Sequence, residues 1–418
     1  MKKDNTAKSS PSTPGWEELE AFVRGRVQEF VQGILEEEVT ELLGRARYER
    51  RAEVDPVLGY RNGYGKERKL STTFGTIQLR RPRVRGLRER FESRILPLFK
   101  RRTEQVGELL PKLYLHGLAH GDFDMALCGL LGDGAPLSPG SIARLKEVWQ
   151  SEYEAWRSRP LHDLEVVYLW VDGIYVKAGL EKEKAAVLVA VAGLRDGRKV
   201  VVAVEAGHRE STESWSSILR DLKKRGMGAP KLVIGDGHLG IWGGLANVFP
   251  EAKEQRCWNH RIVNVLDKIP EKHQAQAKLL LKPIPYSDTH EEAERLKKVF
   301  QDWCKKNNLL HAARLIDEDW ARMVTFYSFP KEHWKHLRTT NVAESPLATV
   351  RLRTTAAKRY KKVENATAVI WKVLLVAEST FRRLDSAELL REVAEGAIYV
   401  DGERVRKADE QVDQEAAA

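Results

Sequence analysis

The sequence has little cysteine and no long apolar segment. Its three cysteines, Cys128, Cys257 and Cys304, are spread over 418 residues. An odd number of widely spaced cysteines argues against a disulfide framework and indicates free thiols in a reducing compartment. Residues 1–15 lack the apolar core of a secretory signal, and the longest nearly apolar run, 185–194, is far shorter than the ~18 residues of a membrane helix. We therefore expect a cytoplasmic protein with no membrane partner.

Positive charge is concentrated in one segment of an otherwise balanced chain. Hydrophobic residues make up 42% and charged residues 31%, which is typical of globular proteins, and the net charge is +10. Residues 61–102 contain fourteen Lys or Arg against three acids, so the rest of the chain is close to neutral. Such a segment suits a polyanion such as DNA, whose phosphates are neutralised by Lys and Arg; a solvated loop or an acidic protein partner is the alternative. The residues of this segment that we expect to bind DNA are Arg61, Lys66, Arg68, Lys69, Arg81, Arg83 and Arg85.

The N-terminal region reads as a helix followed by a hairpin. Apolar residues recur at three- and four-residue spacing over residues 16–50, which predicts a long amphipathic helix. Its apolar face either packs on its own domain or forms a dimer contact. Residues 59–85 are rich in Gly, Thr and Arg with short β-like runs, which predicts a small basic hairpin.

Residues 104–156 have a helical pattern again. Two short helices and a turn precede a third helix, which Ser138 and Pro139 would begin as N-cap and first residue. This order fits a helix-turn-helix whose last helix would place Arg144 in a DNA major groove. A plain three-helix bundle fits the pattern equally well.

After residue 160 the pattern changes to that of an α/β domain. Apolar β-like runs occur at 166–171, 185–194, 200–204 and 232–234, with a helical run at 214–224 before the last of them. Three strands, a helix and a further strand predict a mixed sheet.

Two aspartates follow apolar runs of this predicted sheet. Asp172 and Asp236 each come directly after such a run and each precede a glycine. If the two strands are neighbours, both carboxylates lie at one edge of the sheet, where α/β proteins bind ligands. Hard oxygen ligands of this kind suit magnesium, and two such ions support in-line phosphoryl transfer. An Asp-Gly turn is the alternative for either residue taken alone.

Glu344 is the candidate for a third carboxylate, 108 residues after Asp236. It lies at the start of a predicted helix, so a capping box with Asn341 is a strong alternative, and Ser345 with Pro346 would be another N-cap pair. A second basic cluster follows in residues 351–362, and the members that we expect to hold phosphates include Arg351, Arg353 and Lys358.

At these residues the sequence resembles the Mutator-like family of bacterial insertion-sequence transposases. The resemblance extends from the first helix to about residue 385 and is carried by residues 60–64 (YRNGY), 171–177 (VDGIYVK), 234–240 (IGDGHLG), 255–260 (QRCWNH) and 340–345 (TNVAES). It implies an α/β ribonuclease H-like mixed-sheet core with an all-α insertion, preceded by a helical, helix-turn-helix DNA-binding region. It also implies that Asp172, Asp236 and Glu344 form a DDE triad that is both catalytic and metal-binding. The implied cofactor is Mg²⁺ or Mn²⁺, as two ions.

The motif around Cys257 has a structural and a functional interpretation. Cys257 and His260 form a Cys-x-x-His pair, but a zinc site normally takes four ligands and no second pair has finger-like spacing. The resemblance implies that Arg256 and His260 contact the scissile region of DNA, with His260 assisting proton transfer. A packed cysteine beside a hydrogen-bonded histidine is the alternative. Lys177 is a further expected phosphate contact.

These patterns divide the chain into seven segments. They are a disordered tail (1–15), an N-terminal helix with the basic DNA-binding region (16–103), a helix-turn-helix-like domain (104–160), the first part of the core (161–269), a helical insertion (270–335), the last part of the core with the glutamate helix (336–400) and a second disordered tail (401–418).

Together they predict a DNA transposase acting on double-stranded DNA. We expect it to bind the inverted-repeat ends of its element, cleave there and join the ends to target DNA, as a homodimer or larger homo-oligomer. Two alternatives stay open: a nuclease of the same fold without strand transfer, and a non-catalytic DNA-binding regulator derived from a transposase.

Overall fold

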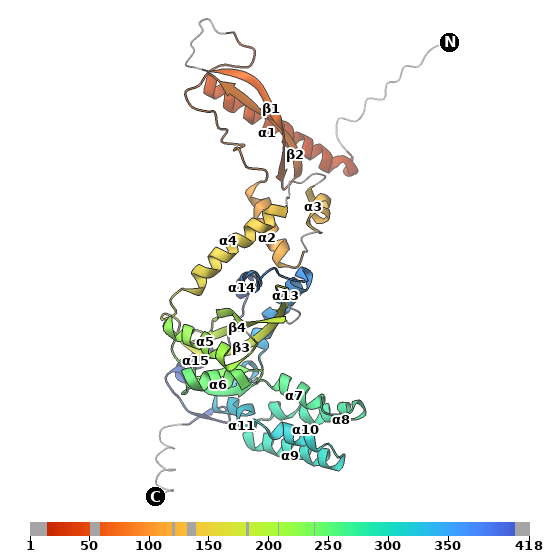
Figure 1. The fold of residues 1–418 in the computed structure, drawn as a ribbon, viewed down its shortest axis with the longest axis vertical. Coiled ribbons are helices and arrows are strands. Elements are labelled where there is room, and N and C mark those ends of the chain that lie inside the picture. The colour runs from red at the N-terminus through yellow and green to blue at the C-terminus, as the bar shows by residue number, and fades with distance from the viewer. Residues whose placement is uncertain are drawn as a thin grey trace, which may run out of the picture. The chain divides into compact units, whose positions relative to one another are not determined.

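A computed structural model describes residues 15–50, 59–118, 122–131, 139–180, 184–207, 209–237 and 239–405 (Figure 1). The chain divides into two compact units, with the boundary between Leu145 and Lys146 inside helix α4 (Pro139–Arg157). In the described residues, no helix combines the length and apolar character needed to span a bilayer.

The first unit begins with the predicted helix and hairpin. After a short 3-10 turn, η1 (Trp16–Glu18), helix α1 (Leu19–Leu43) ends at Gly44, whose φ of +59° is the left-handed conformation that glycine favours at a helix C-terminus. Strands β1 (Tyr60–Thr72) and β2 (Gly75–Arg85) pair antiparallel. A small apolar core between α1 and β2 holds them together; it comprises Leu35, Ile77, Leu79 and Leu96.

The three predicted helices follow the hairpin as α2 (Glu104–Leu115), α3 (Phe123–Leu131) and α4. Pro139 is the first residue of α4, as predicted, whereas the predicted cap Ser138 lies outside the described residues.

The second unit is built on a five-stranded mixed sheet, as the sequence predicted. Its strands are β3 (Val166–Lys177), β4 (Lys184–Leu194), β5 (Lys199–Gly207), β6 (Leu232–Gly235) and β7 (Lys253–Arg256), in the order β5-β4-β3-β6-β7. The first three strands pair antiparallel, whereas β6 and β7 run parallel to β3. The short strand β7 was not predicted, because its sequence Lys-Glu-Gln-Arg has no apolar pattern.

Helices cover both faces of this sheet (Figure 1). Helices α5 (Thr212–Lys224) and α6 (Leu239–Val248) bury Trp215, Leu219 and Ile241 against one face, in a core shared with β3, β4, β5 and β6. Ser211 begins α5 by accepting a hydrogen bond of 3.2 Å from the N–H of Ser214. Helices α13 (Asn341–Ala357) and α14 (Val363–Glu378) pack on β3 and β5 respectively.

The segment between Asp236 and Glu344 is mostly helical beyond β7, as predicted. Its elements are α7 (Trp258–Leu266), α8 (Glu271–Leu281), η4 (Ile284–Tyr286), α9 (His290–Lys306), α10 (Leu310–Asp317), α11 (Trp320–Met323), η5 (Thr325–Ser328), η6 (Lys331–His333) and α12 (Trp334–Leu337). Buried Arg261 ties α7 to the end of α10, because its Nη2 donates to the carbonyl oxygens of Leu315 and Glu318.

The C-terminal residues correct one prediction. Helix α15 (Ala387–Ala394) is followed by a small hairpin of β8 (Tyr399–Val400) and β9 (Glu403–Arg404). Residues 401–405 are thus ordered, whereas the sequence predicted a disordered tail from residue 401. Gly402, at φ +83°, turns the chain back and packs on Trp334. The rest of the two expected tails, 1–14 and 406–418, lies outside the described residues.

Candidate active site

The two predicted aspartates lie on neighbouring parallel strands. Strand β3 does not end at Asp172, as the sequence suggested, but continues to Lys177, because Ile174 and Val176 are buried and pair with β4. Asp172 is therefore inside a strand, opposite Val189 of β4. Asp236 directly follows β6. Since Trp170 pairs with Ile234, both aspartates stand two residues beyond the same parallel pair, and hence at the same level of the sheet.

Glu344 lies in the first turn of α13, as predicted, but neither of the two alternative caps, Asn341 and Ser345, is the N-cap of this helix. The cap residue is Thr340, whose hydroxyl donates to Oε1 of Glu344. Asn341 is already helical, and Ser345 and Pro346 lie inside the helix. Pro346 is tolerated near the start of the helix, where it leaves a single carbonyl, that of Val342, without its usual donor.

Burial and nearby negative charge both raise the pKa of Asp172. Its side chain is buried, and burial raises its pKa to about 7, aided by the carboxylates of Glu344 and Asp236. The N–H of Gly173 donates to Oδ1 at 2.8 Å and His260 also lies nearby, and both oppose this rise. The other oxygen, Oδ2, is buried and has no hydrogen-bond partner in the described part of the chain. The structure thus brings the three predicted carboxylates together, and in the described residues it leaves Oδ2 of Asp172 without a hydrogen-bond donor.

His260 and Cys257 adjoin Glu344. The ligand atoms of these three residues lie within 4.8 Å of one another, and Nδ1 of His260 is 3.7 Å from Oε1 of Glu344. A hydrogen bond to the Cys257 side chain and the nearby carboxylates of Glu344 and Asp236 raise the pKa of His260 to about 9, although burial opposes them. His260 is therefore a cation at neutral pH, placed beside the carboxylates.

Cys257 itself is fully buried at the start of α7. Its Sγ accepts a hydrogen bond of 3.3 Å from the N–H of Thr340 and lies 3.3 Å from the Thr340 hydroxyl oxygen, whose proton is donated to Glu344. Within the residues described, the group Cys257, His260 and Glu344 supplies three ligands, one fewer than a structural zinc site takes. The contacts instead link α7 to the start of α13, which carries Glu344.

Arg256 does not lie on a surface that DNA would reach. Its side chain is buried and its Nη1 donates to Oδ2 of Asp319 at 2.5 Å. It also packs on the backbone of Gly237, where an added Cβ would lie 2.1 Å from its Nε. The expectation of a phosphate contact is therefore replaced by an internal role beside Asp236. The sequence offered no sign of the partner Asp319.

The basic hairpin separates into internal and exposed cations. Arg61 donates to Thr40 Oγ1 of α1 at 2.7 Å, Arg68 donates to the carbonyl oxygen of Lys100 at 2.8 Å, and Arg81 donates to that of Phe91 at 2.8 Å. These three predicted DNA contacts are engaged in holding the unit together. The predicted contacts whose side chains are exposed are Lys66, Lys69, Arg83 and Arg85.

Arg144 is exposed on α4, and it lies near enough to Arg102 to lower the pKa of that guanidinium together with burial, which is the larger cause. In the second unit, Lys177 is exposed at the end of β3, where the N–H of Tyr360 donates to its carbonyl oxygen at 2.9 Å. Tyr360 follows exposed Lys358 by two residues.

The cluster in residues 351–362 is divided in the same way. Arg351 and Lys358 are exposed. Arg353 is only 2% exposed, which contradicts its expected phosphate contact, because it faces inward from α13. A charge count along the sequence does not show which side of a helix each cation occupies.

Comparison with known proteins gives consistent matches. Residues 4–383 match the profile of the family described as "Transposase, Mutator family". The chain is 43% identical over 298 residues to the transposase for insertion sequence element IS6120 of Mycolicibacterium smegmatis, which covers 71% of this chain and 92% of that protein. It is 37% identical over 279 residues to the transposase for IST2 of Acidithiobacillus ferrooxidans, covering 66% and 94%. It is 29% identical over 354 residues to the transposase for ISRM5 of Rhizobium meliloti, covering 83% and 85%.

Proposed function

This chain belongs to the Mutator family of transposases, and from that premise we propose that it binds the inverted-repeat ends of an insertion sequence and catalyses metal-dependent strand cleavage and strand transfer. One observation carries the proposal: Asp172 and Asp236 stand at the same level of adjacent parallel strands, and Glu344 on α13 lies within electrostatic range of Asp172. Carboxylates so arranged are suited to phosphoryl transfer on DNA.

The donor set fits a divalent cation. Three carboxylates converge, and the buried Oδ2 of Asp172 has no hydrogen-bond partner in the described residues. Hard oxygen donors of this kind suit Mg²⁺ or Mn²⁺, and we propose that Asp172, Asp236 and Glu344 hold two such ions. When bound, the ions would supply Lewis-acid activation of the attacking oxygen and stabilisation of the leaving oxygen.

The chain's own groups prepare the site. Thr340 fixes one oxygen of Glu344, and the N–H of Gly173 fixes Oδ1 of Asp172. Protonated His260 lies beside Glu344, where it can hold a scissile phosphate or give a proton to a leaving 3′ oxygen. We expect exposed Lys177, Arg351 and Lys358 to neutralise DNA phosphates outside the carboxylate site.

We further propose a ribonuclease H-like core, in which the strand order β5-β4-β3-β6-β7 carries the triad and the helices between β7 and α13 form the insertion. Helices α2, α3 and α4 would form the helix-turn-helix that reads the element ends through Arg144. A homodimer or larger assembly is proposed because two DNA ends must be joined to one target.

Excision and junction formation in cells test the function. A marker is flanked by the DNA that borders this gene, and wild type is compared with Asp236→Asn, which keeps the shape of the side chain and removes its charge. Joined or circular products with wild type alone support the proposal. Cleaved ends without joined products would indicate a nuclease. Equal background with DNA binding retained in both would indicate a DNA-binding regulator.

A further inference from the structure

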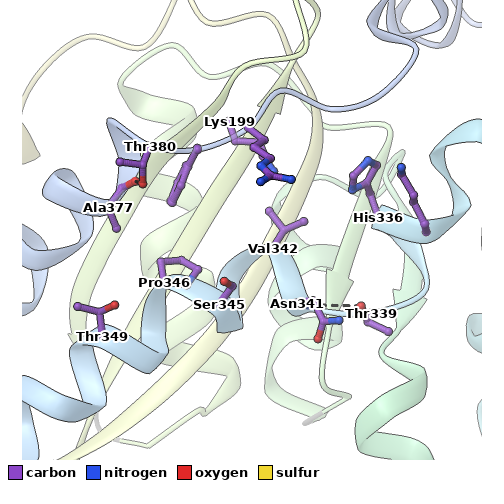
Figure 2. A pocket seen from close by; sticks show the side chains of 13 residues that line it. Lys199, His336, Thr339, Asn341, Val342, Ser345, Pro346, Thr349, Ala377 and Thr380 are labelled. Carbon is purple, nitrogen blue, oxygen red and sulfur yellow. Dashed lines mark hydrogen bonds between the residues drawn. The ribbon is translucent and has the colours of Figure 1, made fainter.

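A cavity of about 430 Å³ lies between α13, the C-terminal end of α14 and the first residue of β5 (Figure 2). Helix α13 contributes Asn341, Ser345 and Thr349, which recur every fourth residue and so share one face. Glu344 points from a different face of the helix, toward Thr340 and His260. The cavity is therefore separate from the carboxylate site, although one helix serves both.

The lining of this cavity is positively charged. Lys199, Lys335 and Arg382 line it, and no acidic residue does so in the described part of the chain. Lys335 is neutralised by an ion pair with Asp385. Lys199 and Arg382, in contrast, have no carboxylate partner among residues 15–405 where these are described. Two cations that lack a carboxylate partner in the described residues thus line one cavity.

Burial makes the charge of Lys199 costly. Its side chain is half-buried at the start of β5, and burial lowers its pKa. Its neighbour His336 does not help, because burial together with Lys199 and Lys335 lowers the pKa of His336 to about 4 and keeps this ring neutral. A ligand with negative charge would compensate this cost, because an opposite charge stabilises a partly buried cation.

The remaining polar groups suit an oxyanion. Hydroxyl groups of Ser345 and Thr349 and the amide of Asn341 line the cavity, and Figure 2 shows them around the same hollow as Lys199. The Thr380 hydroxyl also lines it, but it donates to the carbonyl oxygen of Ala377 at 2.8 Å. Hydroxyl and amide groups donate hydrogen bonds to phosphate oxygens, and Lys and Arg neutralise their charge. The cavity therefore offers both parts of a phosphate site.

We propose that this cavity binds a backbone phosphate of duplex DNA through Lys199 and Arg382. The proposal rests on the proposed function, which supplies DNA as the substrate. The phosphate belongs either to the element end or to the target, and its chemistry is the same in both. A strand held here is fixed against the helix that carries Glu344, so the contact sets where that strand lies relative to the carboxylates.

DNA binding by the full chain tests the cavity. The double variant Lys199→Gln/Arg382→Gln is compared with Lys305→Gln/Lys306→Gln, which removes the same charge from the exposed end of α9. The probes are a duplex from the DNA that borders this gene and an unrelated duplex of equal length. We expect the cavity variant to bind DNA about tenfold more weakly, and the slope of log K against log salt concentration to be smaller in magnitude by about one. The control should match wild type in both quantities.

A second variant guards against a folding defect. Thr380→Glu places a negative charge at an exposed position of the lining and leaves both cations in place. It is expected to weaken binding without changing the thermal melting temperature. Unchanged affinity and salt dependence in both cavity variants, or equal weakening in the α9 control, would overturn the proposal.

Separate assays of cleavage and joining assign the phosphate. Loss of end cleavage in the cavity variant assigns it to the element end, whereas normal cleavage with lost joining assigns it to target DNA. The binding assay does not require strand cleavage or joining. A wild-type protein that binds DNA without joining it would therefore refute the proposed function and still test the cavity.

Discussion

Arg256 donates a hydrogen bond of 2.5 Å to Asp319, and both side chains are largely buried, at 10% and 21% exposure. Asp319 also accepts from Arg322 at 2.7 Å. Because Arg256 packs on Gly237, this pair connects the helical segment at α11 to the loop that carries Asp236. The position of a candidate metal ligand thus depends on a residue 83 positions away from it.

Asp319→Asn is predicted to destabilise the protein. The substitution leaves the buried Arg256 without a counter-charge, and breaking such a pair costs about 3 kcal/mol. Urea unfolding monitored by tryptophan fluorescence measures the change. Asp302→Asn, which breaks the exposed pair with Lys305 on α9, is the control and should cost less than about 0.5 kcal/mol. Equal effects of both substitutions would refute the argument.

Gly237→Ala is predicted to be far more harmful than Gly173→Ala. At Gly237 φ is +95° and a Cβ would lie 2.1 Å from the fixed Arg256 side chain. At Gly173 the Cβ would meet the movable end of Glu210, and φ is ordinary. We expect Gly237→Ala to lose about 2 kcal/mol of stability and most junction formation, since it displaces Asp236. Comparable junction yields from the two variants would contradict this placement of Arg256.

Asp172→Asn is predicted to stabilise the metal-free protein at pH 8. The pKa of Asp172 is about 7 in the folded protein and about 3.9 when unfolded. Between these values the folded state holds a proton that the unfolded state releases, so stability falls as pH rises from about 4 to 7 and stays lower above 7. Asparagine has no proton to lose in this range, so the Asp172→Asn variant does not show this fall in stability.

The expected gain over wild type is about 2 kcal/mol at pH 8 and close to zero at pH 4. Urea unfolding in the presence of a chelator measures it at both pH values. Junction formation should be lost in the same variant. A stability difference that is independent of pH would show that the carboxylate is not the cause. Asp163→Asn, at a side chain that is 88% exposed, is the matched control.

His260 is predicted to titrate near pH 9 in the metal-free protein. Cys257→Ala removes the first cause of this raised pKa and should move it toward the ordinary value near 6.5. NMR of the histidine ring protons measures the shift. Cys304→Ala, at a cysteine buried in α9, should leave the titration unchanged. An unchanged His260 titration in Cys257→Ala would show that Glu344 and Asp236 suffice to keep the ring charged.

The exposed cations of the hairpin are predicted to bind DNA without supporting the fold. Lys66→Gln/Lys69→Gln should lower the salt dependence of DNA binding by about two and leave the melting temperature unchanged. Arg68→Gln should do the reverse, because its guanidinium holds the carbonyl oxygens of Pro97 and Lys100. Filter binding at several salt concentrations, with thermal melting of each variant, separates these effects. A destabilised Lys66→Gln/Lys69→Gln variant would contradict the assignment.

The sequence pattern was sufficient to predict the strands that are buried on both faces. Runs such as 185–194 and 232–234 are apolar without interruption, so they predicted β4 and β6 and through them the mixed sheet. The sequence pattern did not predict the correct end of a strand that continues beyond a polar residue. Asp172 and Gly173 read as a turn, and nothing local shows that Ile174 and Val176 return to the core and prolong β3.

The candidate site was predictable as a set of residue types but not as contacts. Asp172, Asp236 and Glu344 were named from strand ends and a helix start, and the structure places them together. The roles of Arg256 and Arg353 were not predictable, because a basic residue in a basic segment gives no sign of burial. Thr340 was the missed signal: a threonine before the helix is a common N-cap, and here it binds Glu344.

The three carboxylates are delivered by parts of the chain that emerge from the ribosome at different times. The five strands of the mixed sheet are complete once residue 256 has been made, and with them Asp172 and Asp236. Glu344 arrives with α13, and α14, which packs on β5, arrives later still. A nascent chain or a truncated product that ends near residue 300 therefore holds both aspartates but lacks the third carboxylate. Synthesis itself keeps the set of acidic groups incomplete until residue 344 of 418 has been made.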